Sequence, residues 1–206
     1  MDLVMIRFGV ILTFVLTAFA AHGQRFSWGI KAGVNVNDIY IVTDQPSIRD
    51  MIHPTTSFHG GLYGQLSMGR KFSFIPELQF IQKGFLIRNP VSEVKYRINY
   101  IEIPLLISYS VFKYLNIDVG QVNGFKISAR AKIGDDKRDI TDSYYTYDFG
   151  LTGGVRVNFN KRISLSSRYV WSLNAMSKSP LGFYVYKESN RNLLFSLTYL
   201  LKKAND

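Results

Sequence analysis

The sequence predicts an all-β fold: an antiparallel, up-and-down transmembrane β-barrel of about eight strands, preceded by a cleaved signal peptide. First, apolar and polar residues alternate along segments of roughly ten residues, the length that a tilted strand needs to cross a bilayer. Second, the connections between these segments alternate between long and short, as in barrels with short periplasmic turns and long external loops. Third, no segment beyond the N-terminal leader reaches the ~20 apolar residues of a spanning helix, so a membrane form of this chain must cross as strands.

The N-terminus predicts export. Arg7 precedes an apolar core at residues 8–19, which is too short for a spanning helix, and Ala21-His22-Gly23 places small residues where a signal peptidase cleaves. We therefore assign residues 1–23 to the signal peptide and residues 24–206 to an outer-membrane β-barrel domain, with a mature start at Gln24 or Arg25. Met5 is an alternative initiation site, and an uncleaved anchor is the alternative role for this segment.

Eight segments carry a period of two, which predicts strands with two unlike faces. They span residues 26–37, 58–68, 72–83, 100–109, 114–128, 145–159, 163–171 and 193–201. Their apolar faces begin, in this order, at Phe26, Phe58, Phe72, Ile101, Leu115, Tyr145, Ile163 and Leu193. In the fourth segment, which could start near Tyr96, the apolar set changes parity between Tyr100 and Ile101. That change indicates either a bulge or the membrane boundary.

Four polar connections read as long loops, at residues 38–56, 84–95, 130–143 and 174–190, and they are the expected contact surface. Prolines interrupt the first two, and Gly134 opens a turn in the third. The short connections at residues 69–71, 110–113 and 160–162 each carry Lys or Arg. This order predicts that both chain ends are periplasmic.

Alternation alone does not say which face is outside, because a soluble lipocalin-like barrel also alternates, with apolar residues inside. Here the polar face is rich in Gly and Ser, and aromatic residues gather near the strand ends, as in membrane barrels. We therefore place the polar face inside. Its charged members would form a paired network in a narrow, plugged lumen: Lys31, Glu77, Lys83, Glu102, Asp118, Asp148, Arg156 and Arg168.

Composition excludes several classes of function. The chain has no cysteine, so it has no disulfides, thiolate chemistry or lipoprotein anchor. Its formal charge is +10, but the basic residues form no run or nucleic-acid motif, so we expect no nucleic-acid partner. No spacing of residues suggests a metal site, and no phosphate or dinucleotide motif occurs, so we expect no cofactor.

Two polar features need a separate explanation. Gln121 and Asn123 fall on the predicted lipid face of the fifth strand, which indicates either a local bulge that turns them inward or a protein contact through that strand. Of the histidines, His22 lies in the leader and His53 in the first long loop, while His59 is expected to face inward near Ser57. A Ser57–His59 pair is the only candidate for catalysis, and a polar lumen histidine is the alternative.

Several stretches resemble a known family: the run at residues 100–109 with its Ile-Pro-Leu-Leu core, residues 147–151 followed by Gly153-Gly154, and the Arg168-Tyr169 strand. Together they resemble the Bacteroidetes outer-membrane β-barrel family, the PorT-like or "porin family" proteins. The resemblance implies an outer-membrane barrel of about eight strands and no single activity, although one group of the family assists a secretion system. Such barrels usually end on an aromatic residue, whereas here residues 202–206 follow Leu201; Tyr199 and Leu201 are the candidates in its place.

These observations predict a non-enzymatic outer-membrane protein with a structural, secretion or assembly-accessory, or interaction role. Its expected partners are outer-membrane lipid, the barrel assembly machinery, and a protein bound through strand five or the external loops. A small-solute pore is the first alternative and predicts unpaired charges along a wet lumen. A lipid-modifying enzyme predicts loss of activity on His59→Ala, and a soluble lipocalin-like binder predicts a monomer without detergent.

Overall fold

The computed structural model describes residues 26–90, 92–178 and 185–202. The predicted signal peptide lies outside the described residues. Within them, no helix is both long enough and apolar enough to span a membrane.

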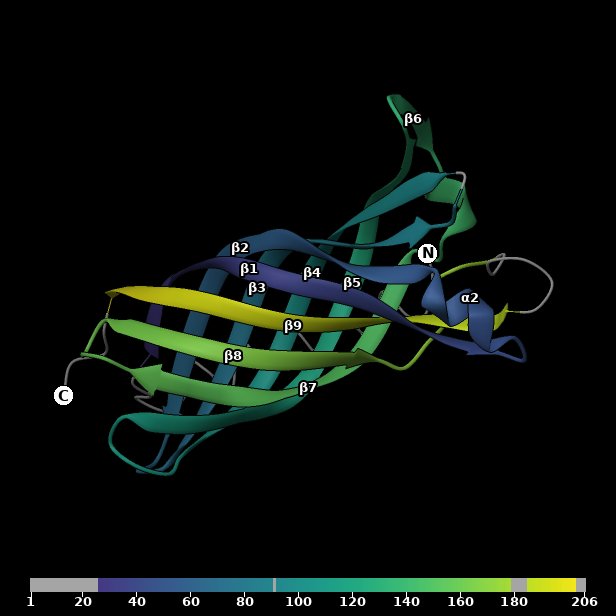
Figure 1. Cartoon of the computed structure of the whole chain (residues 1–206). Helices are drawn as coiled ribbons and strands as arrows, with labels where there is room; N and C mark the ends of the chain where they lie inside the picture. The colour runs from purple at the N-terminus through teal and green to yellow at the C-terminus, as the bar shows by residue number, and fades with distance from the viewer. Residues whose placement is uncertain (1–25, 91, 179–184, 203–206) are drawn as a thin grey trace, which may run out of the picture.

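The chain forms a closed antiparallel barrel (Figure 1). Eight of its nine strands form the ring, in the order β4-β3-β2-β1-β9-β8-β7-β5, and a pairing of β4 with β5 closes it. The ninth, β6, pairs only with β5 and projects beyond the ring. The elements are β1 (Phe26–Thr43), α2 (Pro46–Asp50), β2 (Ile52–Met68), β3 (Phe72–Arg88), β4 (Glu93–Ser110), β5 (Leu115–Ile133), β6 (Asp136–Asp139), a 3-10 turn η1 (Thr141–Ser143), β7 (Tyr147–Asn158), β8 (Ile163–Ser172) and β9 (Val185–Lys202).

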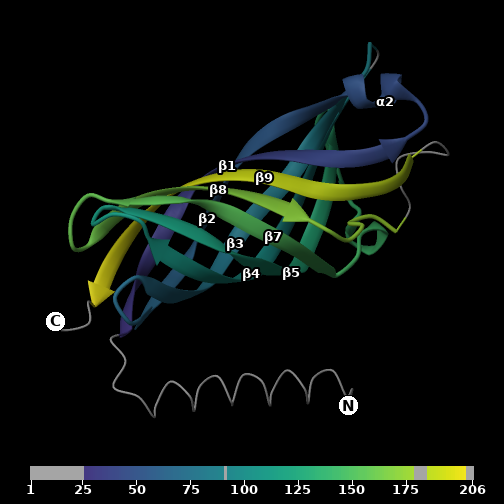
Figure 2. The same cartoon turned by 90° about the horizontal axis from the view of Figure 1, so that it is seen from below.

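The two ends of the barrel differ. The connections β2–β3, β4–β5 and β7–β8 are short and gather at one end, the short-turn end, where β1 begins and β9 ends. At the other end, the loop end, α2 and the longer connections lie (Figure 2). The predicted strands match the observed ones within two residues at the short-turn end. At the loop end the prediction was wrong, because strands continue through much of residues 38–56, 84–95 and 130–143.

Apolar side chains point outward and polar side chains point inward over most of the wall. In β1, for example, Trp28, Ile30 and Val34 are 41–52% exposed, whereas Lys31 and Asn35 are buried. A large exposed apolar surface of this kind requires lipid rather than water around it. The lipocalin-like alternative, which needs the opposite arrangement, is therefore wrong.

The polarity of the two faces inverts near the loop end. On β4, the even-numbered residues from Ile98 to Ser108 are buried throughout, so no residue changes side. Glu102 and Ser108 are polar inside the barrel, whereas Ile98 and Tyr100 are apolar inside it, and Arg97 faces outward. The parity change in the sequence therefore arises because the apolar residues of β4 move from the outer face to the inner face, and not because the strand has a bulge.

The inversion occurs at the same height on three neighbouring strands, β3, β4 and β5. The continuous outward apolar run ends at Phe80 on β3 and at Ile101 on β4, which are paired with each other, and the next outward pair is Gln82 and Asn99. A register shift between β4 and β5 occurs at the same height, where Asn99 pairs with Ser128 but Tyr100 pairs with Lys126. The outward apolar residues of β3 extend from Phe72 to Phe80, and this length matches the roughly nine to eleven residues of a transmembrane strand. We call this zone the apolar belt, and the part of the barrel beyond it the rim.

Candidate functional site

The interior of the barrel holds all eight charged side chains that the alternation predicts. They come from six strands: Lys31 from β1, Glu77 and Lys83 from β3, Glu102 from β4, Asp118 from β5, Asp148 and Arg156 from β7, and Arg168 from β8. None of these residues is more than 4% exposed. Strand alternation directs each of them inward, and closure of the ring brings them together.

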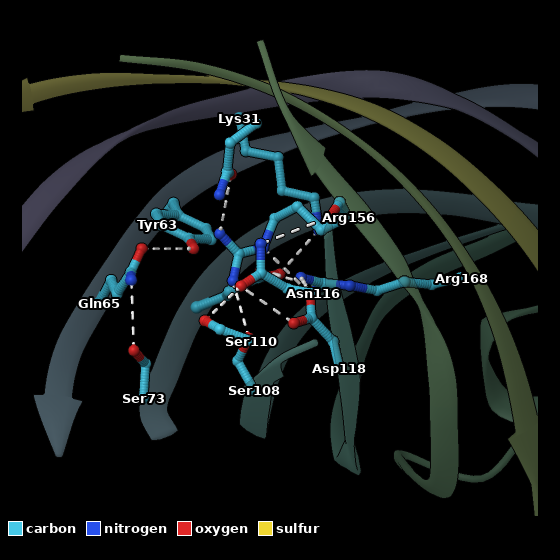
Figure 3. A network of polar contacts seen from close by, with 12 residues as sticks. Lys31, Tyr63, Gln65, Ser73, Ser108, Ser110, Asn116, Asp118, Arg156 and Arg168 are labelled. Atoms are coloured by element: carbon cyan, nitrogen blue, oxygen red, sulfur yellow. Dashed lines mark hydrogen bonds and ion pairs between the residues drawn. The ribbon is translucent and has the colours of Figure 1, made fainter. Parts of the chain in front are cut away.

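Five of these residues form one connected cluster, the five-charge cluster. The Glu77 carboxylate accepts hydrogen bonds from Lys31 Nζ and from Arg168 Nη1, both at 2.8 Å. Arg168 Nη2 also donates to Asp118 Oδ2 at 3.0 Å, and Arg156 Nε lies 3.3 Å from the same oxygen. Positive and negative groups thus alternate along the chain of contacts, from Lys31 to Arg156. Figure 3 labels Lys31, Arg168, Asp118 and Arg156 of this cluster.

The other three residues form a second group, the three-charge cluster. Lys83 Nζ lies 2.7 Å from Glu102 Oε1 and 2.9 Å from Asp148 Oδ2. Since this cluster has one cation and two carboxylates, and the five-charge cluster has three cations and two carboxylates, their formal charges are −1 and +1 and cancel. Both charges of a buried pair lose their hydration, and their mutual attraction and hydrogen bonds offset this penalty, which an isolated buried charge would bear in full.

Neutral polar side chains add further hydrogen bonds to both clusters. Ser108 Oγ accepts from Arg156 Nη2 at 2.8 Å, and Gln79 Nε2 donates to Glu102 Oε2 at 2.9 Å. Asn190 Nδ2 donates to Asp148 Oδ2 at 2.8 Å, and Ser172 Oγ contacts the same oxygen at 3.1 Å. Of these four, Asn190 was predicted to be in a loop. Its inward position was missed because β9 begins before the alternation becomes visible in the sequence.

An apolar layer closes the interior toward the loop end. The buried members of this apolar plug are Ile39, Ile41, Ile81, Phe85, Ile98, Tyr100, Val122, Ala129, Tyr144, Met176, Val170, Val185 and Leu194. The three-charge cluster meets the plug where Lys83 Nζ lies 4.9 Å from the centroid of the Tyr100 ring. Residues from α2 and the connections cover the layer: Ile48 packs against it, and Tyr145 N donates to Met176 O at 2.9 Å.

At the rim, Tyr186 donates its hydroxyl to Asp44, and this contact raises the pKa of Tyr186.

At the short-turn end the interior opens into a cavity of about 510 Å³. Buried Tyr63 and Arg156 are among its lining residues, as are the turn residues Lys113, Lys161 and Arg162. The Arg156 guanidinium lies 5.8 Å from the centroid of the Tyr63 ring. The five-charge cluster therefore lies between this cavity and the rest of the interior.

His59 lies inside the barrel but does not bind Ser57. Its Nε2 lies 2.8 Å from Ser196 Oγ and its Nδ1 lies 3.4 Å from Asn35 Oδ1, whereas Ser57 Oγ contacts Asn37 at 2.6 Å. His59, Ser196 and Asn35 are each at most 2% exposed, and none of them lines the cavity at the short-turn end. His53 lies on β2, paired with Leu86, rather than in a loop.

Gln121 and Asn123 both face outward, and the strand has no bulge at either residue. β5 pairs continuously with β4 and with β7 on both sides of them, so the expectation of a local bulge was wrong. Gln121 is exposed. Asn123 is only 8% exposed, and its Oδ1 accepts a hydrogen bond from the Tyr147 hydroxyl at 2.7 Å. In the described part of the chain, no group of three or more His, Cys, Asp or Glu side chains could hold a metal ion.

Comparison with known proteins identifies the class of barrel. A model of the family described as "Outer membrane protein beta-barrel domain" matches residues 19–178. No curated protein matches the sequence. Among solved structures, Ail, the attachment invasion locus protein of Yersinia pestis, is 11% identical with a TM-score of 0.50, covering 86% of this chain and 99% of that chain. Neisserial surface protein A (NspA) is 10% identical with a TM-score of 0.52, covering 84% of this chain and 96% of that chain. At these identities the likeness concerns the fold alone.

Proposed function

This chain belongs to the outer membrane protein beta-barrel domain family, and we propose that it is a non-enzymatic, non-conducting barrel that presents a folded rim for interaction at the cell surface. In this proposal the loop end faces the outside, and the short-turn end and both termini face the periplasm. Its role is structural, or accessory to secretion or assembly, through contacts that the rim makes. The barrel assembly machinery is its expected partner during insertion.

The inversion of polarity above the apolar belt is the observation that carries this proposal. Below the inversion the wall suits lipid. Above it, β3, β4 and β5 have an apolar interior and a mostly polar outer face, as a water-soluble β-structure has. The strands β1 to β5 and β9 contain 17 to 19 residues each, more than the roughly nine to eleven that cross a bilayer. A barrel of this design supports an ordered surface outside the membrane.

The alternative functions have less support. A solute pore requires a continuous wet path, whereas two paired charge clusters and the apolar plug occupy the interior. A hydrolase requires an accessible nucleophile. Ser196, His59 and Asn35 have the order of contacts of a catalytic triad, but they are buried.

A narrower assignment within the family rests on the sequence. The Ile-Pro-Leu-Leu core of β4 and the Gly153-Gly154 pair of β7 support a place among the PorT-like proteins of the Bacteroidetes. This placement favours a role beside a secretion system. It also suggests a protein contact on the outer wall, where Gln121 is exposed.

Cysteine labelling in intact cells tests the proposed orientation. The chain has no native cysteine, so single substitutions report one site each. Asp50→Cys and Asp135→Cys at the loop end should react with a membrane-impermeant maleimide in intact cells. Arg70→Cys and Lys161→Cys at the short-turn end should react only after the outer membrane is opened. The reverse pattern would contradict the proposal, and labelling after denaturation controls for expression.

A further inference from the structure

One wall of the rim carries a concentrated positive charge. A cavity of about 120 Å³ lies on the outward face of β3 to β6, and the residues that line it are Gln82, Lys95, Arg97, Asn99, Arg130, Ala131, Lys132 and Lys137. Five of these are cations and none is a carboxylate. We call the five residues Lys95, Arg97, Arg130, Lys132 and Lys137 the cationic rim patch.

Strand register places the like charges of this patch side by side. Lys95 of β4 pairs with Lys132 of β5, which in turn pairs with Lys137 of β6, so three lysines form one row. In the next row Arg97 pairs directly with Arg130. Like charges directly opposite each other destabilise an antiparallel pair, so this arrangement is unfavourable unless an anion binds between them.

The carboxylates near the patch compensate only part of its charge. Lys132 is the only one of its five residues with a carboxylate within 4.0 Å among the described residues, Asp135 at 3.8 Å. Asp139 pairs in register with Arg130, and its carboxylate accepts a hydrogen bond from Thr141 N at 2.8 Å, which lowers the pKa of Asp139 and keeps it ionised. With both carboxylates counted, the patch still has three positive charges in excess.

The position of the patch indicates which anion would reach it. The row formed by Gln82, Asn99 and Ser128 is linked by hydrogen bonds of 3.1 and 3.0 Å and lies directly below the patch. Below this row, Phe80 and Ile101 end the apolar belt. The patch therefore faces sideways at the height where hydrocarbon gives way to headgroups. Its cavity has the volume of about four water molecules, comparable to a tetrahedral oxyanion with four oxygens.

From this geometry we propose that the cationic rim patch binds the phosphate group of a lipid headgroup in the leaflet around the loop end. Arg97 and Arg130 would hold the phosphate because the paired N–H donors of each planar guanidinium can bind two phosphate oxygens at once. The three lysines would neutralise its remaining charge. The proposal rests on the proposed orientation only for the leaflet concerned, which would be the outer one. Lipid A is the phosphate-bearing lipid to test there.

The proposal is tested by comparing the stability of a variant without the two arginines with that of the native protein, both without lipid and with phosphorylated lipid. The test variant is Arg97→Gln/Arg130→Gln. The matched control is Arg49→Gln/Arg138→Gln, which removes the same charge at the same end of the barrel but outside the patch; Arg138 is the neighbour of Lys137 and points to the other face of β6. Each full-length protein is refolded in zwitterionic detergent, and its folding is checked by the shift of its gel band on boiling.

Without lipid, the test variant should be at least as stable as the native protein, because a like-charge pair is removed. With lipid A added, the unfolding midpoint of the native protein and of the control should rise. The test variant should bind lipid A about tenfold more weakly or worse, since it loses two charge-assisted contacts. Lipid A whose phosphates have been removed should stabilise none of the three proteins through this patch.

Three results would overturn the proposal. Equal lipid A binding by the test variant and the control is the first, and equal binding of phosphorylated and dephosphorylated lipid A is the second. The third is a patch that binds a soluble sulfated glycan or inorganic phosphate to saturation, while lipid A leaves the unfolding midpoint unchanged. Because lipid A is supplied in detergent to the whole protein, the test does not depend on orientation. If cysteine labelling contradicted the proposed orientation, the assignment to the outer leaflet would be wrong, but the proposed phosphate site would not be affected.

Discussion

The buried carboxylate of Glu77 shows how single residues maintain the interior. It accepts hydrogen bonds from two cations, Lys31 of β1 and Arg168 of β8, whose strands are separated by β9 in the ring. A buried ion pair contributes little net stability compared with a well-packed apolar alternative, but breaking one leaves an uncompensated charge. The eight charges of the two clusters are therefore expected to specify one arrangement of the strands more than to stabilise the fold.

Neutralising this carboxylate should be costly. Glu77→Gln leaves Lys31 and Arg168 with one fewer negative partner, and we expect the free energy of unfolding to fall by about 3–5 kcal/mol. Glu93→Gln is the matched control, because Glu93 is paired with Arg88 at 2.8 Å but its side chain is 53% exposed; its effect should stay within about 1 kcal/mol. Urea unfolding in lipid vesicles, followed by the gel-band shift, measures both. Equal losses would show that the lumen charges are not coupled as the distances suggest.

The serine beside His59 allows a direct test for hydrolase chemistry. Because Ser196 is 2% exposed, an electrophile in solution should not reach it. We expect a fluorophosphonate probe, which labels activated serines, to leave the folded protein unlabelled. Labelling that disappears in Ser196→Ala, but persists in Ser57→Ala, would instead establish a reactive serine and revive the enzyme alternative.

At the scale of the strands, prediction from sequence succeeded at one end and failed at the other. Below the inversion, residues such as Ile30 and Lys31 of β1 contrast sharply in polarity, so a period of two is visible. Above it, Ile39 and Ile41 are buried while Tyr40 and Val42 point outward, so both faces are apolar and the pattern disappears. The strand continues because its pairing to β9 continues, and a single sequence does not reveal that pairing.

The two outward amide side chains of β5, Gln121 and Asn123, lead to opposite predictions for the effect of a leucine substitution on stability. The Gln121 amide has no hydrogen-bond partner within the described residues, so Gln121→Leu should leave the barrel equally stable or more stable in lipid. Asn123→Leu removes the acceptor of the Tyr147 hydroxyl and should cost about 1 kcal/mol. Urea unfolding in vesicles measures both effects.

The double variant, with both residues changed to leucine, tests the contact that we infer for this wall. It should still fold, but a protein complex that uses β5 should dissociate on a native gel. Complexes that survive the double change would refute a contact through this strand.

At the scale of the whole molecule, the sequence predicted eight of the buried charges but placed a further one, Glu188, in a loop. It also did not show how the eight divide into two clusters. Alternation alone placed Lys83 and Arg156 inward. That Lys83 joins Glu102 and Asp148, while Arg156 joins Asp118, depends on the stagger of the closed ring, which no local pattern encodes. The apolar plug was missed for a related reason: its members come from widely separated segments, and the tyrosines and isoleucines among them resemble lipid-facing residues in sequence.

The layered interior leads to a prediction about transport. An ion that entered the cavity at the short-turn end would have to pass the five-charge cluster, the three-charge cluster and then the apolar plug, which includes Phe85 and Ile98, each 0% exposed. Displacing paired charges and hydrating an apolar layer are both unfavourable, so the closed state should dominate. In planar bilayers we expect no steady conductance of porin size, whereas a porin in the same lipid provides the positive control. A steady, voltage-independent current from the purified protein would contradict the plugged lumen. If Phe85→Ala and Ile98→Ala each increased that current, it would pass through the barrel itself, and the solute-pore alternative would replace the proposed function.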